Sequence, residues 1–254
     1  MIGWCRPLSD APLMRDIGLD FVEVALAPLG LEDRETFAAA RKAVAGAALP
    51  TAAFNTFLPR DLRVVGPEAD LPRFRDYLKR ASELLALGEA RVVVFGSGWA
   101  RNIPEGWDRA RGEEEMREAL RLSADALAGT GTTLVIEPLN REESNLINSL
   151  SEGRDFAEAI DRPEIRFLAD FYHMDEEDEP LDELVANAAG LIHVHLADTG
   201  RMSPGTGSYP YELFFAKLRE AGYRGMISAE WGVTDLEADM RASLAFLRRH
   251  WSRV

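Results

Sequence analysis

The sequence of 254 residues has little or none of several features on which particular protein classes depend. It contains one cysteine, Cys5, so neither an internal disulfide nor a cysteine-based zinc cluster can form. It lacks an apolar run of about twenty residues, the length needed to cross a bilayer. The first seven residues lack the basic and apolar regions of an export signal. We therefore expect a cytoplasmic protein that does not span a membrane.

Positive charge is outnumbered by negative charge. The chain has 29 lysines and arginines against 43 aspartates and glutamates, which gives a formal net charge of −14. Proteins that bind nucleic acid or anionic membranes neutralise phosphates with a basic surface. Neither nucleic acid nor a membrane surface is therefore an expected partner.

What the sequence does contain is a regular alternation of strand and helix patterns. Short runs rich in Val, Ile, Leu or Phe predict strands buried on both faces, at about residues 2–5, 21–25, 51–55, 91–95, 133–137, 166–170, 191–196 and 226–230. Amphipathic spacing predicts helices between them, at about residues 32–46, 70–87, 111–128, 151–160, 181–188, 210–221 and 234–249. The first connection, at about residues 9–17, is short. The acidic run 175–179 is expected to be a solvated loop, with Pro180 starting the next helix.

Eight such repeats predict an α/β fold, a single (β/α)8 TIM barrel of parallel strands over residues 1–254. The main rival is a doubly wound open sheet. That rival often carries a GxGxxG or GxxxxGK[ST] motif after an early strand, and the sequence has neither.

Four polar side chains stand at the ends of the last four predicted strands: Glu137, Asp170, His195 and Glu230. Taken singly, each has an ordinary structural explanation, such as a carboxylate paired with an arginine. His193 and His195 point to the same face of their strand, and either is an ordinary buried histidine when taken alone. Together, three carboxylates and an imidazole at one barrel mouth would repel one another without a positive centre. The set therefore favours a bound divalent metal ion.

Five segments carry a resemblance to a known family: residues 137–143, 168–174, 193–201, 204–207 and 228–230. They resemble the xylose-isomerase-like TIM-barrel superfamily, and within it the sugar isomerases and epimerases typified by the ketose 3-epimerases. The resemblance is close in the C-terminal half of the chain and architectural in the N-terminal half. It implies a homodimer or homotetramer.

The resemblance also implies roles for individual residues. The metal ligands would be Glu137, Asp170, His195 and Glu230, while His193 would lie deeper in the barrel. Substrate would be contacted by His173 and Arg201, with Glu143 as a supporting carboxylate. Residues 55–59, beginning with Asn55, and residues 95–98 would shape the pocket.

An oxygen-rich set with one imidazole suits Mn²⁺ best, with Mg²⁺, Co²⁺ or Zn²⁺ as alternatives. The expected activity is a sugar or sugar-acid isomerase or epimerase that abstracts a proton next to a carbonyl and forms an enediolate. Glu137 and Glu230 would serve as base and acid. The substrate would be a carbohydrate or a hydroxy-keto acid, and epimerisation and isomerisation both stay open.

Other side chains near the predicted mouth allow two interpretations each. Arg60, Arg101, Arg141 and Arg201 follow predicted strands, where they would read an anionic substrate group or pair with nearby acidic residues. The tryptophans Trp4, Trp99 and Trp231 would form an apolar wall for a sugar or simply pack in the core.

The same residues also fit two other functions. An inosose-dehydratase-like lyase would use the same proton abstraction and then expel a hydroxyl group. A non-catalytic sugar-binding barrel would keep the pocket and lose one of the two glutamates, and both are present. An apurinic endonuclease is excluded because it needs a histidine-rich zinc cluster and a basic face, whereas this chain has four histidines and a strong negative charge.

Overall fold

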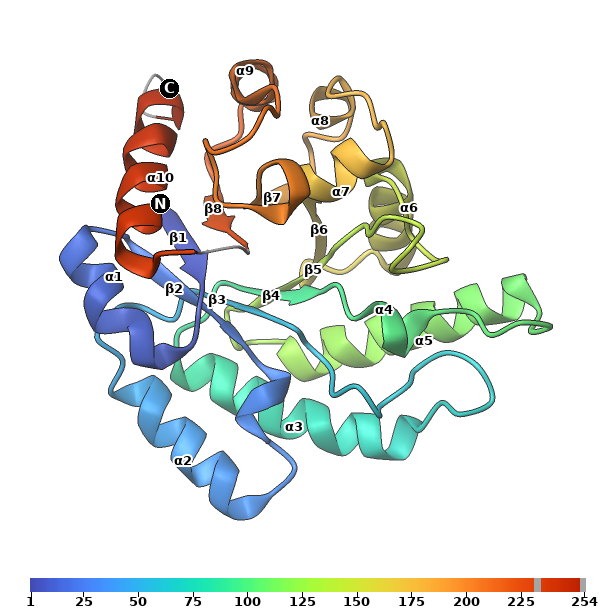
Figure 1. Cartoon of the computed structure of the whole chain (residues 1–254). Coiled ribbons are helices and arrows are strands. Elements are labelled where there is room, and N and C mark those ends of the chain that lie inside the picture. The colour runs from blue at the N-terminus through green and yellow to red at the C-terminus, as the bar shows by residue number, and fades with distance from the viewer. Residues whose placement is uncertain (231–233, 252–254) are drawn as a thin grey trace.

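The computed structural model describes residues 1–230 and 234–251 and contains a closed barrel of eight parallel strands (Figure 1). The strands are β1 (Ile2–Cys5), β2 (Phe21–Ala25), β3 (Ala53–Asn55), β4 (Val92–Phe95), β5 (Thr133–Ile136), β6 (Ile165–Asp170), β7 (Leu191–Leu196) and β8 (Met226–Ala229). Each strand pairs with its neighbour in sequence, and β8 pairs with β1 to close the barrel. The predicted (β/α)8 barrel is confirmed, and the open sheet is excluded.

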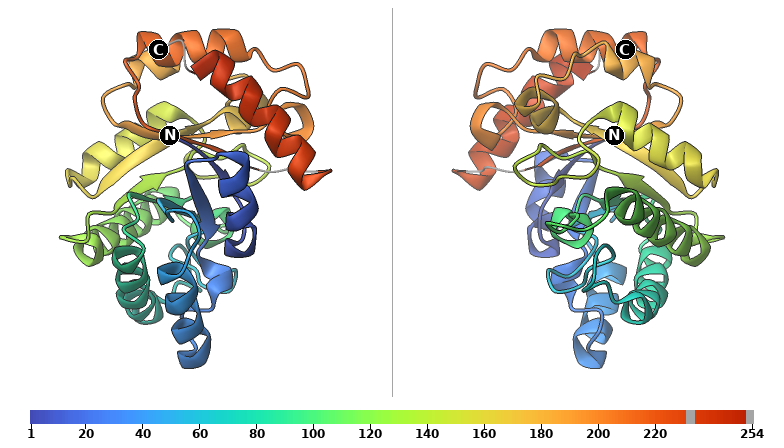
Figure 2. Two further views of the ribbon diagram at one scale, coloured as in Figure 1. Left: turned by 90° about the vertical axis from the view of Figure 1, so that its left-hand side faces the viewer. Right: turned by 90° about the vertical axis from the view of Figure 1, so that its right-hand side faces the viewer.

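Helices surround the strands on the outside, as Figures 1 and 2 show. They are α1 (Ala11–Ile17), α2 (Arg34–Ala45), α3 (Leu71–Leu87), α4 (Gly98–Arg101), α5 (Arg109–Leu127), α6 (Leu150–Ile160), α7 (Phe171–Glu176), α8 (Glu183–Ala186), α9 (Tyr211–Glu220) and α10 (Leu236–Trp251). Short 3₁₀ turns follow three strands: η1 (Leu8–Asp10), η2 (Ala27–Leu29) and η3 (Thr199–Arg201). The first and last helices, α1 and α10, contact each other and complete the outer layer.

Local sequence explains where four of the described helices begin. Asp33, Asp70, Asp108 and Ser149 accept hydrogen bonds from backbone N–H groups in the first turns of α2, α3, α5 and α6. These caps satisfy donors that a helix leaves free at its N-terminus.

The apolar side chains form two buried layers. One lies between the strands and the helices and includes Phe54, Phe74 and Leu120. The other fills the barrel interior and includes Phe21, Val94 and Leu168. The interior is therefore a packed core, and the open space of the barrel mouth lies above it, at the carboxyl ends of the strands.

Two short helices were not predicted, and one predicted helix begins later than expected. Helix α7 starts directly at the end of β6, so Asp175 and Glu176 are helical and only the rest of the acidic run is a loop. Helix α8 begins at Glu183 instead of Pro180. Helix α4 has a single turn, which is too short to show a periodic pattern. Within the described ranges, no helix combines the length and apolarity needed to cross a bilayer.

Candidate metal centre and substrate pocket

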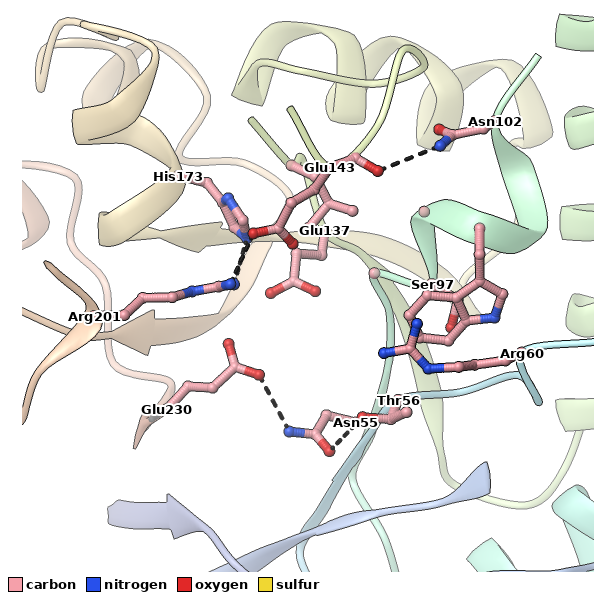
Figure 3. A pocket seen from close by; sticks show the side chains of 14 residues that line it. Asn55, Thr56, Arg60, Ser97, Asn102, Glu137, Glu143, His173, Arg201 and Glu230 are labelled. Atoms are coloured by element: carbon pink, nitrogen blue, oxygen red, sulfur yellow. Dashed lines mark hydrogen bonds and ion pairs between the residues drawn. The ribbon is translucent and has the colours of Figure 1, made fainter. Parts of the chain in front are cut away.

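The four predicted metal ligands converge at the carboxyl ends of the strands. Glu137 directly follows β5, Asp170 ends β6, His195 lies in β7 and Glu230 directly follows β8. Each offers one ligand atom, and these four atoms all lie within 4.8 Å of one another. Figure 3 shows the carboxylates of Glu137 and Glu230 entering the same space from two sides.

The imidazole of His195 stands at the centre of this cluster. Its Nδ1 lies 2.9 Å from Oε1 of Glu137, 3.2 Å from Oε2 of Glu230 and 3.8 Å from Oδ2 of Asp170. Burial favours the neutral imidazole, but the charges of Glu23 and Glu230 and the hydrogen bond with Glu137 raise the pKa of His195 well above its usual value. The cluster therefore attracts positive charge strongly, and its oxygen-rich donor set fits a divalent cation.

The carboxylates differ in their surroundings. Burial raises the pKa of Glu137, and repulsion from Glu230 and Asp170 adds to that effect, although the hydrogen bond with His195 opposes it. Burial alone would also raise the pKa of Asp170. The charges of His173 and His195 and a backbone hydrogen bond outweigh this effect and hold the pKa below its usual range. Oδ1 of Asp170 accepts from the N–H groups of Tyr172 and His173, so this carboxylate also caps α7. One side chain thus joins the candidate metal centre to the helix that carries His173.

Beneath the cluster lies a carboxylate that the sequence analysis missed. Glu23 of β2 is completely buried, and its Oε1 lies 2.8 Å from Nε2 of His195. Its Oε2 lies 2.9 Å from Nε2 of His193, so one carboxylate bridges both histidines of β7. His193 is buried one layer deeper, as expected, and is not among the four clustered ligand residues. The available signal was a glutamate inside the otherwise apolar run 21–25.

The cluster opens into a cavity of about 400 Å³, shown in Figure 3. Ten of its fourteen described lining residues are polar or charged, among them Glu143, His173 and Arg201. Nδ1 of His173 accepts a hydrogen bond from the N–H of Asn140, which puts the ring proton of the neutral imidazole on Nε2. That Nε2 lies 3.3 Å from Nη2 of Arg201, so two donors converge on one side of the cavity.

Arg201 is held by two further contacts. Its Nη1 donates to Oε1 of Glu143 at 2.7 Å, and its guanidinium lies 4.4 Å from the ring centre of Tyr172. The supporting role expected for Glu143 is therefore compatible with its position.

The segments 55–59 and 95–98 contribute residues to the same cavity. Asn55 donates through Nδ2 to Oε1 of Glu230, over a long 3.4 Å, and accepts from the hydroxyl of Thr56. Gly96 leaves room for Glu137, because a Cβ atom at position 96 would overlap Oε2 of that carboxylate. Both catalytic candidates therefore depend on residues from the first half of the barrel.

The four arginines near the mouth have different surroundings. Arg60 lines the cavity, with its guanidinium 4.8 Å from the ring centre of Trp99. Arg201 pairs with Glu143, as one of the two interpretations expected. Arg141 forms an ion pair with Glu177, which is distant from it in sequence.

Arg101 is not placed to bind an anionic substrate group, because it is not among the described residues that line the cavity. It is fully buried and donates to the carbonyl oxygens of Phe95 and Glu137 at 3.0 and 2.6 Å. These bonds tie together the ends of β4 and β5. Neither of its two expected roles applies, because a guanidinium with five donors also satisfies backbone carbonyls.

The three tryptophans also have different outcomes. Trp99 lines the cavity, and its indole N–H donates to the carbonyl oxygen of Pro59 at 3.0 Å. Trp4 is buried in the core and is not among the lining residues described, so it belongs to the packing interpretation. Trp231 lies outside the described residues.

Known proteins resemble this chain over most of its length. The xylose isomerase-like TIM barrel family matches residues 12–250. The 3-dehydro-D-guloside 4-epimerase of Escherichia coli is 34% identical over 182 residues, which are 67% of this chain and 69% of that protein. The D-psicose 3-epimerase of Ruminiclostridium cellulolyticum is 28% identical over 160 residues, which are 62% of this chain and only 53% of the relative.

Solved structures extend the likeness to the whole barrel. The 3-keto-D-glucoside 4-epimerase from E. coli, in its apo form, has a TM-score of 0.82 and 26% identity and is covered over 98% of both chains. An L-ribulose 3-epimerase has a TM-score of 0.84 at 22% identity, covering 99% of this chain and 94% of that one, which shows the shared fold. The chain belongs to the xylose isomerase-like TIM barrel family.

Proposed function

We propose that this protein is a divalent-metal-dependent sugar or sugar-acid isomerase or epimerase. One observation carries the proposal: three carboxylates surround Nδ1 of His195 at the floor of a polar cavity at the barrel mouth. The relatives support it, since their names describe epimerases of psicose and of an oxidised guloside.

The ion would be held by Glu137, Asp170, His195 and Glu230, with Mn²⁺ as the first choice and Mg²⁺, Co²⁺ or Zn²⁺ as alternatives. When bound, it supplies a Lewis acid that stabilises negative charge developing on the oxygens of the substrate. The fit rests on the donor set and on the mutual repulsion that the buried carboxylates would otherwise suffer.

Glu137 and Glu230 would transfer the proton. They approach the cavity from two sides (Figure 3), so one carboxylate takes the proton beside the carbonyl and the other returns a proton to the opposite face. That sequence inverts one carbon and is an epimerisation. Return of the proton to the neighbouring carbon would give an aldose–ketose isomerisation.

The remaining cavity residues would orient the substrate. Nε2–H of His173 and the guanidinium of Arg201 offer adjacent donors for one substrate oxygen. Asn55 would hold Glu230, Glu143 would hold Arg201, and Trp99 would present an apolar face to sugar carbons.

The test is an NMR screen in D₂O with Mn²⁺-reconstituted protein and a panel of ketoses, aldoses, their phosphates and hydroxy-keto acids. Deuterium should enter a carbon next to a carbonyl, and Glu137→Gln and Glu230→Gln should each lower the rate by at least about a hundredfold. Glu142→Gln, a change at a neighbouring exposed glutamate, is the matched control and should keep the rate.

Other outcomes identify the alternatives. A product lighter by one water would indicate a dehydratase. Exchange that survives Glu137→Gln would contradict the assigned base. Sugar binding with no exchange across the panel would favour a binding protein.

A further inference from the structure

A second cavity of about 790 Å³ adjoins the polar one at the barrel mouth. The two share three described lining residues, Asn55, Thr56 and Glu230, so they meet beside one of the proposed catalytic carboxylates. Their walls differ in chemistry. Seven of the eleven described residues around the second cavity are apolar, whereas most around the first are polar.

The turns after β1 and β2 build this apolar wall. Leu8 begins η1 and Leu29 ends η2, and both pack partly buried against the main core. Pro7 and Pro28 lie beside them. Because these side chains are supported by the core, the wall is a fixed surface instead of a patch of loosely held side chains.

Among the described residues of this wall, the one cationic side chain is already paired. Nε of Arg6 donates to Oδ2 of Asp10 at 2.7 Å, and both side chains are largely shielded. The cavity therefore offers little to an anionic group. Its chemistry suits a neutral and mainly apolar occupant.

We propose that the second cavity binds the glycosidic substituent of the substrate, so that the preferred substrate is a glycoside that carries its carbonyl on a ring carbon other than the anomeric one and has a neutral, apolar aglycone. This inference rests on the proposed function. With the reacting carbon near Glu137 and Glu230, the rest of the sugar ring faces the polar wall, and a substituent directed past Asn55 and Thr56 enters the apolar cavity. A free monosaccharide leaves that cavity to water.

The test compares three forms of one sugar whose carbonyl lies on a ring carbon other than the anomeric one, in the D₂O exchange assay: the free sugar, its methyl glycoside and its phenyl glycoside. Burial of a phenyl ring against this wall should raise kcat/KM about tenfold over the methyl glycoside. Leu29→Gln and Leu8→Gln should each reduce the phenyl-to-methyl ratio at least about threefold. Leu213→Gln, at a half-exposed leucine of α9 away from the cavity, is the matched control and should keep the ratio.

The outcomes separate this inference from the proposed function. Exchange with a phenyl-to-methyl ratio near one would overturn the substituent site and leave the isomerase or epimerase standing. If no compound exchanges, calorimetric titration with unreactive phenyl and methyl glucosides tests whether the second cavity binds the substituent. Tighter binding of the phenyl compound that Leu29→Gln abolishes would support the site although the proposed reaction had failed, and equal binding would refute it.

Discussion

The two halves of the barrel contribute differently to the candidate site. The C-terminal half, β5 to β8, carries all four proposed ligands at or next to its strand ends. The N-terminal half, β1 to β4, supplies the groups that hold them. Glu23 bonds His195, Asn55 bonds Glu230, and Gly96 leaves space for Glu137.

This division has a physical cause. A metal centre needs few donors, and consecutive parallel strands bring them to one rim. Buried charges also need partners, and barrel closure brings those from the opposite wall, as Glu23 of β2 reaches β7. The proposed reacting groups thus come from one half, and their orientation depends on the other.

The largest expected effect follows from breaking the C-terminal half at its centre. His195→Gln removes the nitrogen donor and leaves the carboxylates without their imidazole, so Mn²⁺ affinity should fall at least about a hundredfold. Isothermal titration calorimetry on folded, metal-stripped protein measures this. His193→Gln is the matched control and should stay within about tenfold of the unmodified protein. A larger loss of Mn²⁺ affinity in His193→Gln than in His195→Gln would identify His193 as the ligand instead.

The next largest effect tests the N-terminal half by steric means. Gly96→Ala places a methyl group where Oε2 of Glu137 lies, so the carboxylate must move and the exchange rate should fall at least about tenfold. Gly46→Ala on the outer surface, where the backbone is not left-handed, is the control. Full activity in Gly96→Ala would mean that the position of Glu137 tolerates displacement and that the two halves are less coupled than the geometry indicates.

A smaller effect is expected from the carboxylate beneath the metal centre. Loss of such outer partners typically weakens metal binding by about 10–100-fold. Because Glu23→Gln loses the charge but keeps a hydrogen-bond acceptor for His195, we expect the lower end of that range, about tenfold. The pH profile should also move. Protons compete with metal at His195, so affinity falls as pH falls, and without the Glu23 charge the pKa of His195 drops and the loss begins at lower pH. An unchanged affinity and pH profile in a folded variant would limit Glu23 to packing.

The same contrast explains how much could be predicted from the sequence. The strands, the barrel and the convergence of Glu137, Asp170, His195 and Glu230 followed from local patterns, because each group stands at the end of an apolar run. The contacts of Glu23, Gly96 and Arg101 lie across the barrel or between neighbouring strands. Sequence spacing carries no information on such contacts. For Glu23, the one available signal was a glutamate inside an otherwise apolar run, and that signal did not identify its partners.

The smallest effect concerns Glu179, a carboxylate outside the candidate metal cluster. It distinguishes the pH dependence of stability from the pH dependence of Mn²⁺ affinity. Burial raises the pKa of Glu179 to about 7, and its Oε1 accepts a hydrogen bond from the N–H of Leu150 at the start of α6. Between the ordinary value of 4.5 and about 7, the native protein keeps a proton that the unfolded chain has released, so stability falls as pH rises through this window. Glu179→Gln keeps the acceptor and should flatten this part of the profile in urea unfolding of metal-free protein. Because Glu179 is not among the clustered ligand residues, the pH dependence of Mn²⁺ affinity should stay unchanged. A shift in both profiles would show that the loop after α7 is coupled to the metal centre through Asp170, and the support of the site would then extend beyond the N-terminal half.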